Sequence, residues 1–192
     1  MYSRYVDGKE YTFGVSGRLY KSNVLLYDHQ TDSLWSQLMK KAISGPLAGK
    51  KLQMVLSGRM KWKTWKKNSP ATLVLSEDTG YARNYSIDPY EGYYRAGALM
   101  FPVGDVRRDF SAKDRILGIE VDNHAKAYSL DWLSKNPGVH EDMLGDHPIR
   151  IEVSPHGEIL AVKDAMGQPI PATYSYWFAW QAFHYDTEVF KK

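Results

Sequence analysis

The segment Ile149-Arg150-Ile151-Glu152-Val153 alternates apolar with charged side chains along its whole length. A period of two residues is the pattern of a β-strand that buries one face and exposes the other. Further short apolar runs, most of them next to turn residues, lie at 11–15, 24–27, 51–55, 72–75, 116–121, 125–128 and 159–162. The chain is therefore predicted to be mainly β (α+β), built from antiparallel sheets.

Three other segments carry helical signals, and all three contain tryptophan. Segments 61–68 and 176–184 each place two Trp residues three positions apart, which puts both on one face of a helix. A third helix is predicted at 131–135, with Asp131 as its N-terminal cap. We therefore expect two or three short Trp-bearing helices beside the sheets.

The two Trp pairs belong to a longer internal repeat. Each W-x-x-W motif is followed by Thr seven residues after the second Trp and by Val two residues later, at a constant offset of 177 − 62 = 115 positions. We interpret residues 1–192 as a single domain formed by an incomplete duplication, with halves of about 1–115 and 116–192. The first half would contain an insertion at 20–50 and a long loop at 78–115. The Trp residues expected in the core are Trp62, Trp65, Trp177 and Trp180.

The composition excludes several classes of protein. Hydrophobic residues make up 43% of the chain and aromatic residues 14%, which is enough apolar material to build a core. The chain has no cysteine, so disulfides, thiolate metal sites and thiol catalysis are excluded. No run of 18 uncharged apolar residues occurs, so no membrane-spanning helix is expected. The first residues lack the apolar run of a secretory signal, and nothing in the sequence indicates a compartment.

Positive charge is concentrated in one part of the chain. The net charge is only +3, but nine Lys and Arg residues and no acidic residue lie between Asp32 and Glu77. Such a stretch can bind an anionic partner, or it can form a solvated face balanced by acids from elsewhere. Segment 61–67 interleaves Lys with Trp, as in proteins that bind single-stranded nucleic acid. If the Trp side chains are buried, the lysines are only the wet face of a helix, and nucleic-acid binding is not the expected function.

A first candidate binding segment is the polar stretch 30–37. If it is extended, its odd-numbered side chains point the same way and offer hydroxyls, an amide and an indole to a polar ligand. The same residues could instead form a buried hydrogen-bond network that fixes the segment. The candidate ligand-binding residues here are Gln30, Thr31, Ser33, Trp35 and Gln37.

A second candidate segment lies at 78–94, where tyrosines gather with acids and arginine. Such a loop suits sugars and other polyhydroxylated or planar ligands, although tyrosines also pack loops onto sheets while their hydroxyls stay wet. The candidate residues here are Asp78, Arg83, Tyr85, Asp88, Tyr90 and Tyr94. Asp78 and Asp88 are also the candidate acid or base if the protein is an enzyme.

Other motifs with known chemistry are missing from the sequence. The six histidines form no H-x-H or H-x-x-x-H pair, and there is no G-x-S-x-G, G-x-x-x-x-G-K or G-x-G-x-x-G motif. We therefore expect no metal and no cofactor. The preferred hypothesis is a polar-ligand-binding domain whose site lies between the 30–37 and 78–94 segments. One alternative is an enzyme acting on a sugar-like substrate, and a second is a structural or subunit role.

Several longer motifs resemble one known family. Segments 12–17, 27–37, 45–49, 72–80 and 177–183 are similar to the uncharacterised domain-of-unknown-function family 3179. The resemblance implies an identity but no established activity. Members similar to this chain usually carry a Cys-Pro-Leu-Cys-Gly-like segment shortly before the position of Val6, and this sequence lacks it. Without that region, the strand at 11–15 would expose an edge carrying Phe13 and Val15, so we expect self-association or a partner protein there.

Overall fold

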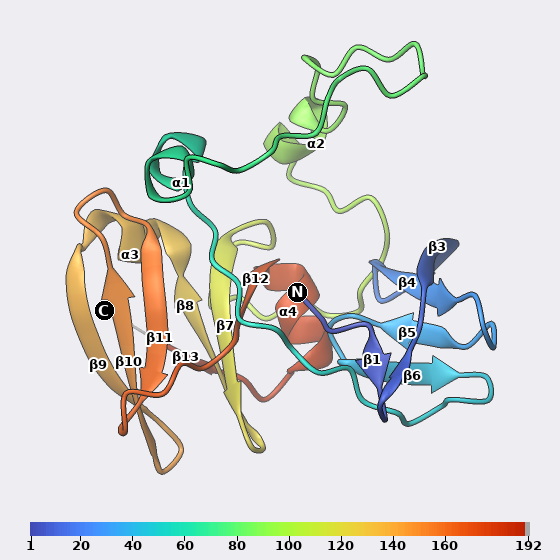
Figure 1. Cartoon of the computed structure of the whole chain (residues 1–192). Helices are drawn as coiled ribbons and strands as arrows, with labels where there is room; N and C mark the ends of the chain where they lie inside the picture. The colour runs from blue at the N-terminus through green and yellow to red at the C-terminus, as the bar shows by residue number, and fades with distance from the viewer. Residues whose placement is uncertain (191–192) are drawn as a thin grey trace.

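The computed structural model describes residues 1–190 and is mainly β, which confirms the predicted fold class. Its strands form four sheets, and all strand pairs but one are antiparallel. Four short helices accompany the sheets (Figure 1). In the described part of the chain, no helix is long and apolar enough to cross a membrane.

The N-terminal part forms an antiparallel sheet in the order β3-β4-β5-β6, with a two-stranded hairpin, β1-β2, beside it. Trp35 is fully buried in this part and packs with Val6, Tyr11, Ala42 and Leu52. The predicted insertion at 20–50 therefore contains most of this sheet. The strand bounds are Tyr5–Val6 (β1), Lys9–Glu10 (β2), Phe13–Tyr20 (β3), Asn23–Asp28 (β4), Leu34–Ser36 (β5) and Lys41–Ser44 (β6).

The C-terminal part contains two further sheets, in the orders β12-β7-β8-β13 and β11-β10-β9. Both contribute to one core, in which Leu117, Leu133, Leu144 and Ile151 are fully buried. The strand bounds are Arg115–Val121 (β7), His124–Ser129 (β8), Gly138–Leu144 (β9), His147–Val153 (β10), Ile159–Asp164 (β11), Ala172–Tyr176 (β12) and Glu188–Val189 (β13). The predicted alternating strand at 149–153 lies within β10.

The helices are α1 (Trp62–Asn68), α2 (Glu91–Arg95), α3 (Leu130–Lys135) and α4 (Trp177–Phe183). Three of them contain Trp, as predicted. The prediction that Asp131 caps α3 is wrong, because the Ser129 side chain accepts a hydrogen bond from the Trp132 N–H and is the cap. Helix α2 lies inside the loop 78–115, where no helix was expected.

Two predicted strands do not form. Residues 51–55 make only isolated bridges, Lys41 with Lys51 and Tyr2 with Met54. Residues 72–75 join none of the four sheets, and Leu73 is 94% exposed. The apolar sequence favours a strand at 72–75, but no neighbouring strand supplies the hydrogen bonds that a strand needs.

The edge at 11–15 can also be located. Within the described residues, β3 pairs with β4 on one side only and is an edge strand of its sheet, and Val15 is 70% exposed. Self-association through this edge stays a prediction.

The two W-x-x-W segments have the same local structure in α1 and α4. The Trp65 Nε1–H donates to Thr72 Oγ1 at 2.9 Å, and the Trp180 Nε1–H donates to Thr187 Oγ1 at 3.0 Å. Both helices also follow an extended cap residue and end with a backbone hydrogen bond to the carbonyl of the second Trp. We call residues 172–189 the closed unit and their counterparts 57–74, at the same offset of 115, the open unit.

The two units differ in what surrounds them. In the closed unit, β12 pairs with β7, β13 pairs with β8, and Trp177 and Trp180 are 0% and 1% exposed. The expectation that Trp62 and Trp65 are also in the core is wrong, because they are 49% and 41% exposed. Figure 1 shows the reason: α1 stands above the sheets, without a sheet of its own to cover.

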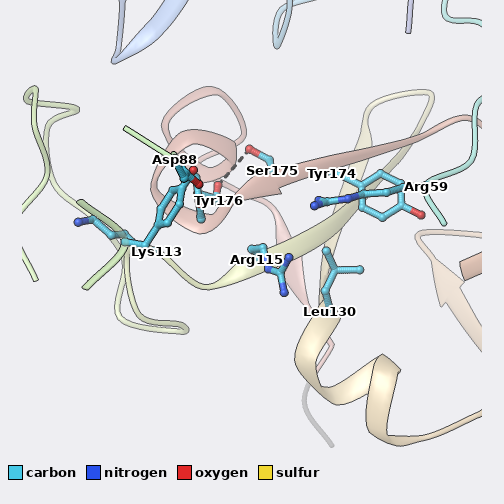
Figure 2. Close-up of a pocket in the computed structure, with 9 residues that line it drawn as sticks. Arg59, Asp88, Lys113, Arg115, Leu130, Tyr174, Ser175 and Tyr176 are labelled. Atoms are coloured by element: carbon cyan, nitrogen blue, oxygen red, sulfur yellow. Dashed lines mark hydrogen bonds between the residues drawn. The ribbon is translucent and has the colours of Figure 1, made fainter. Parts of the chain in front are cut away.

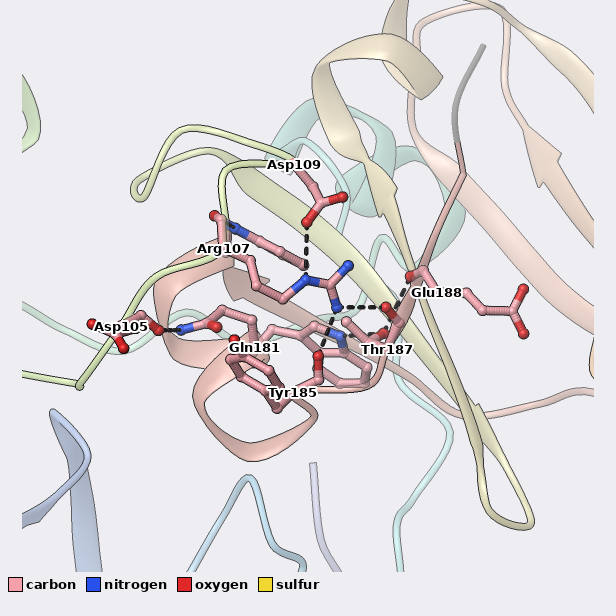
Figure 3. Close-up of polar contacts among 9 residues, drawn as sticks. Asp105, Arg107, Asp109, Gln181, Tyr185, Thr187 and Glu188 are labelled. Atoms are coloured by element: carbon pink, nitrogen blue, oxygen red, sulfur yellow. Dashed lines mark hydrogen bonds and ion pairs between the residues drawn. The ribbon is translucent and has the colours of Figure 1, made fainter.

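Arg107 holds the closed unit together from outside (Figure 3). Its guanidinium pairs with Asp109 at 2.9 Å and donates to the carbonyl oxygens of Tyr185 and Thr187 at 2.7 and 2.8 Å. Its own carbonyl oxygen accepts the Trp177 indole N–H at 2.8 Å. These bonds fix the chain on both sides of α4.

Candidate functional site

A cavity of about 610 Å³ opens where β7 and β12 meet the loop that contains α2 (Figure 2). This volume lies within the usual range for small-molecule sites. Five separate parts of the chain contribute to its wall, and every lining residue except Leu130 carries a polar group. The lining residues are Arg59, Asp88, Tyr94, Lys113, Arg115, Leu130, Tyr174, Ser175 and Tyr176.

None of the three cations in the pocket forms an ion pair with an acid among the described residues, but only two of them are without a hydrogen-bonded role in the loop. Arg59 and Arg115 are exposed, and neither forms an ion pair with any of residues 1–190. Figure 2 shows the Arg59 guanidinium against Tyr174 and the Arg115 guanidinium beside Leu130. Lys113 differs, because its ammonium donates to the Tyr93 carbonyl at 2.6 Å and to the Ala96 carbonyl. Lys113 therefore holds the end of α2, and the two arginines are left for a ligand.

Tyrosines from β12 and α2 form much of the remaining wall. Burial raises the pKa of Tyr174 above its ordinary value of 10.0, and Arg59 partly opposes this shift. Desolvation also raises the pKa of Tyr94, and the nearby negative charge of Asp88 adds to the shift. Both hydroxyls therefore stay protonated at neutral pH and can donate hydrogen bonds.

Asp88 is the one carboxylate among the nine lining residues. Its Oδ1 accepts the backbone N–H of Tyr90 at 2.8 Å, which fixes the turn that leads into α2. A glycosidase of the usual kind needs two carboxyl groups facing each other across the scissile bond. The pocket supplies only one of the two.

The polar segment 30–37 lies in a different environment from the pocket. Thr31, Ser33 and Trp35 meet around Asp28, a fully buried carboxylate that the sequence analysis did not single out. Asp28 Oδ1 accepts the Thr31 N–H at 2.6 Å, and Oδ2 accepts the Trp35 Nε1–H at 2.8 Å. The Thr31 hydroxyl also lies 2.7 Å from the Ser33 hydroxyl.

This network determines the ionisation of Asp28. Burial raises the pKa of Asp28, but the hydrogen bonds from Trp35 and Thr31 outweigh it, so the pKa lies below its ordinary value of 3.8. The carboxylate is thus charged at neutral pH, and its bonds are made within the N-terminal sheet. The alternative that the sequence left open, a hydrogen-bond network that fixes the segment, describes this geometry.

The two ends of the same segment make separate contacts. Gln30 pairs with Thr12 through its side-chain amide, at 3.0 Å from Nε2 to the Thr12 hydroxyl. Gln37 lines a smaller cavity of about 300 Å³ together with Tyr2 and Asn23. None of the five candidate residues from 30–37 lines the larger pocket.

Two of the six candidate residues in 78–94 line the larger pocket, Asp88 and Tyr94. Tyr85 bonds to the Thr79 hydroxyl at 2.6 Å, and Arg83 lies over the Tyr81 ring at 5.8 Å from its centroid. The remaining candidates, Asp78 and Tyr90, also lie outside the lining residues.

Most of the pocket wall was not identified from the sequence. Arg59 was counted only as part of the basic stretch and Arg115 only as the end of the long loop at 78–115, and Tyr174 was not singled out. No spacing in the sequence joins these residues, because they come from separate elements that meet only after folding. Within residues 1–190, no group of three or more His, Asp or Glu side chains is placed to hold a metal ion.

Comparison with known proteins gives one match. The model of the family described as "Protein of unknown function (DUF3179)" matches residues 1–169, in agreement with the resemblance seen in the sequence. The match includes Arg59, Asp88 and Arg115 and ends before β12 and α4. No curated protein and no solved structure matches this chain.

Proposed function

The chain belongs to the DUF3179 family, and from that premise we propose that it binds a small polar ligand with an anionic group in the pocket of Figure 2. The observation that carries the proposal is the pair Arg59 and Arg115, whose guanidiniums line one cavity without a carboxylate partner. Guanidinium groups bind carboxylates and phosphates through paired, charge-assisted hydrogen bonds.

The rest of the wall suits the uncharged part of such a ligand. Tyr94, Tyr174 and Ser175 offer hydroxyl groups, and Asp88 offers a single acceptor carboxylate. Hydroxyl-rich molecules need this mixture of donors and acceptors, with ring faces against their carbon skeleton. The proposed ligand class is therefore a sugar phosphate or sugar acid, bound by its anionic end at Arg115 and Arg59.

The wall favours binding over the enzymatic alternative. Asp88 is the only acid in it, and Asp78, the other candidate acid or base, is not part of the lining. Two arginines without an acidic partner, beside a single carboxylate, favour the binding of an anion over general acid–base catalysis by a pair of acids.

Isothermal titration calorimetry tests the proposal with four probes: glucose 6-phosphate, gluconate, inorganic phosphate and glucose. We expect glucose 6-phosphate or gluconate to bind more tightly than inorganic phosphate, and glucose to bind weakest. Arg115→Gln should weaken binding by about tenfold or more, since a charged hydrogen bond contributes roughly 1.5–3 kcal/mol.

Arg18→Gln is the matched control, because Arg18 is an exposed arginine in β3 and not part of the pocket lining. The control variant should bind like the unmodified protein. If no anionic probe binds, or if both variants lose affinity equally, the proposal fails.

A further inference from the structure

The open unit repeats the local structure of the closed unit but lacks the strands that the closed unit covers. In the closed unit, β12 and β13 lie on the two outer sides of the β7–β8 hairpin, and α4 lies across its face. In the open unit, the counterparts of β12 and β13 are residues 57–61 and 73–74, and neither belongs to a sheet. By comparison with the closed unit, the element missing between residues 57–61 and 73–74 is a β-hairpin like β7–β8.

The closed unit also shows which side chains the hairpin needs. A Cβ atom at Gly118 would lie 2.4 Å from the Trp180 ring, so only glycine leaves room for the indole on β7. Ala127, from β8, completes the buried cluster with Ile116 and both Trp residues. A hairpin that fits beneath such a helix therefore carries glycine in its first strand and a small residue in its second.

The surface of the open unit is apolar where the hairpin would lie. Val74 is 68% exposed, whereas its counterpart in the closed unit, Val189, is half-buried. Leu73, which stands where the closed unit has the exposed Glu188, is an apolar side chain that is 94% exposed. Trp62 and Trp65 are also exposed, yet the Trp65 indole is already held by Thr72 in the same way that Trp180 is held by Thr187. Large exposed apolar side chains gathered in one segment are typical of interaction sites.

We propose that the open unit, residues 57–74, is the docking site for an antiparallel β-hairpin of a partner polypeptide. The first strand of the hairpin runs antiparallel to 57–61 and places a glycine under Trp65. Its second strand runs parallel to 73–74, as β8 does beside β13. The complex reproduces the four-stranded order of the closed unit, with main-chain hydrogen bonds along both sides.

The charged residues of the two units indicate which charge the partner hairpin carries. In the closed unit, Lys126 of the hairpin pairs with Glu188 at 3.4 Å, but the counterpart of Glu188 in the open unit is Leu73. Helix α1 has no acid in its first turn and carries Lys66 and Lys67 in its last. The partner hairpin is therefore acidic on its outward positions, with an apolar residue facing Leu73.

The open unit is fixed in place before any partner arrives. The Lys61 N–H donates to Glu158 Oε1 at 2.6 Å, and the Thr64 hydroxyl lies 3.2 Å from Glu158 Oε2. These bonds join the start of α1 to the turn between β10 and β11. A preformed site of this kind loses less conformational entropy on binding.

A test uses a peptide of residues 114–130 from this chain, closed into a ring by an added terminal disulfide so that the hairpin is preformed. The peptide contains the native Gly118 and Ala127 and no Trp, so tryptophan fluorescence reports only on the protein. A second version carries leucine in place of Lys126, the position that would face Leu73. We expect both peptides to shift the Trp emission to shorter wavelength and to slow amide exchange at Leu73 and Val74.

The matched control is the same peptide with Gly118→Leu, which should bind about tenfold more weakly, a loss of about 1.4 kcal/mol, because the leucine side chain would overlap the Trp65 indole. Trp65→Ala in the protein should also weaken binding of the native peptide. The leucine version should bind more tightly than the native peptide, because an apolar side chain then faces Leu73.

Three results would overturn the proposal. One is the absence of any fluorescence or exchange change at saturating peptide. Another is the same protection of Leu73 and Val74 from raising the protein concentration alone, which would make a second copy the occupant. The third is a larger shift with single-stranded oligothymidine than with either peptide, which would assign the exposed Trp and Lys side chains to nucleic acid.

Discussion

The open and closed units have the same spacing of Trp and Thr and the same local geometry, yet their surroundings are opposite. Trp180 is 1% exposed and Trp65 is 41% exposed, although each indole donates to a Thr hydroxyl seven residues later. Local sequence is thus enough to form the helix and its side-chain bond. Burial is decided by whether a sheet lies beneath the helix.

The comparison also separates two contributions that usually occur together. In the closed unit, the indole–threonine bond is buried and the ring is packed on β7 and β8. In the open unit the same bond is exposed to water, where a hydrogen bond contributes little to stability. Paired substitutions in the two units can therefore measure how much burial contributes to the free energy of unfolding, because the local structure is the same in both.

The largest difference is expected from Trp→Ala in the two units. Trp180→Ala removes a fully buried ring and should lower the free energy of unfolding by about 3–5 kcal/mol. Trp65→Ala should lower it by roughly 1 kcal/mol or less, because the ring is already partly in water. Urea denaturation followed by circular dichroism gives both values, and equal losses would contradict the difference between the units.

The next difference concerns the glycine beneath the helix. A Cβ atom at Gly118 would overlap the Trp180 ring, so Gly118→Ala should cost about 1–3 kcal/mol through overpacking. Gly58, in the open unit, has only the Met60 side chain within 4 Å of such a Cβ atom, at 3.7 Å. Gly58→Ala should therefore change the unfolding midpoint very little, and a loss as large as that of Gly118→Ala would mean that residues 57–61 are packed.

A smaller effect is expected from the two threonines. Thr187→Val leaves the buried Trp180 N–H without its acceptor and should cost about 1–2 kcal/mol. Thr72→Val leaves the Trp65 N–H to water and should cost less than about 0.5 kcal/mol. Thermal unfolding of both variants would show whether this ratio holds, and the shift for Thr187→Val should be the larger one.

The smallest effect is a pH dependence that only the closed unit can have. His184 stacks on Trp180 with ring centroids 4.0 Å apart, whereas its counterpart in the open unit is Ser69. Burial lowers the pKa of His184 below 6.5; the charge of Glu120 opposes this shift and that of Lys40 adds to it. The unfolded chain therefore binds the proton more readily than the folded one below pH 6.5.

The stabilisation from neutral His184 should accordingly be complete above pH 6.5 and decrease as the pH falls through 6.5 toward the lower folded-state pKa. His184→Gln should flatten this part of the stability curve measured by urea denaturation. His29→Gln is the control, because His29 is exposed in the N-terminal part, and this variant should keep the slope. If the pH dependence of stability has the same slope in His184→Gln, His184 is not the source of that pH dependence.

Sequence patterns predicted the local features of this protein well. Alternation located β10, the W-x-x-W spacing located α1 and α4, and the repeat offset placed Thr72 and Thr187 where each bonds to its indole. These features depend on residues a few positions apart, so their geometry follows from the backbone periods of helices and strands. The cap of α3 was misplaced by two residues, because Ser129 and Asp131 are both suitable cap residues.

The candidate site was predicted much less completely. Asp88 and Tyr94 line the pocket, but the residues from 30–37 do not, and Arg59, Arg115 and Tyr174 were not selected. The side chains at 31, 33 and 35 do converge, but on Asp28, whose buried position the sequence does not show. Identical hydroxyls can face a ligand or a buried carboxylate, and composition does not distinguish the two.

The sequence by itself determined the β-rich class, the short Trp-bearing helices and the family, because these depend on local periods and on motifs along the chain. Only the tertiary structure decided which Trp pair is buried, which polar residues face one cavity, and which apolar segment has no strand beside it. These outcomes depend on contacts between residues far apart in the sequence, such as Arg59 with β12 or Trp180 with Gly118. Helices with the same sequence pattern are buried over β7 and β8 and exposed at 62–68. The side chains of such a helix are buried only where a sheet lies against it.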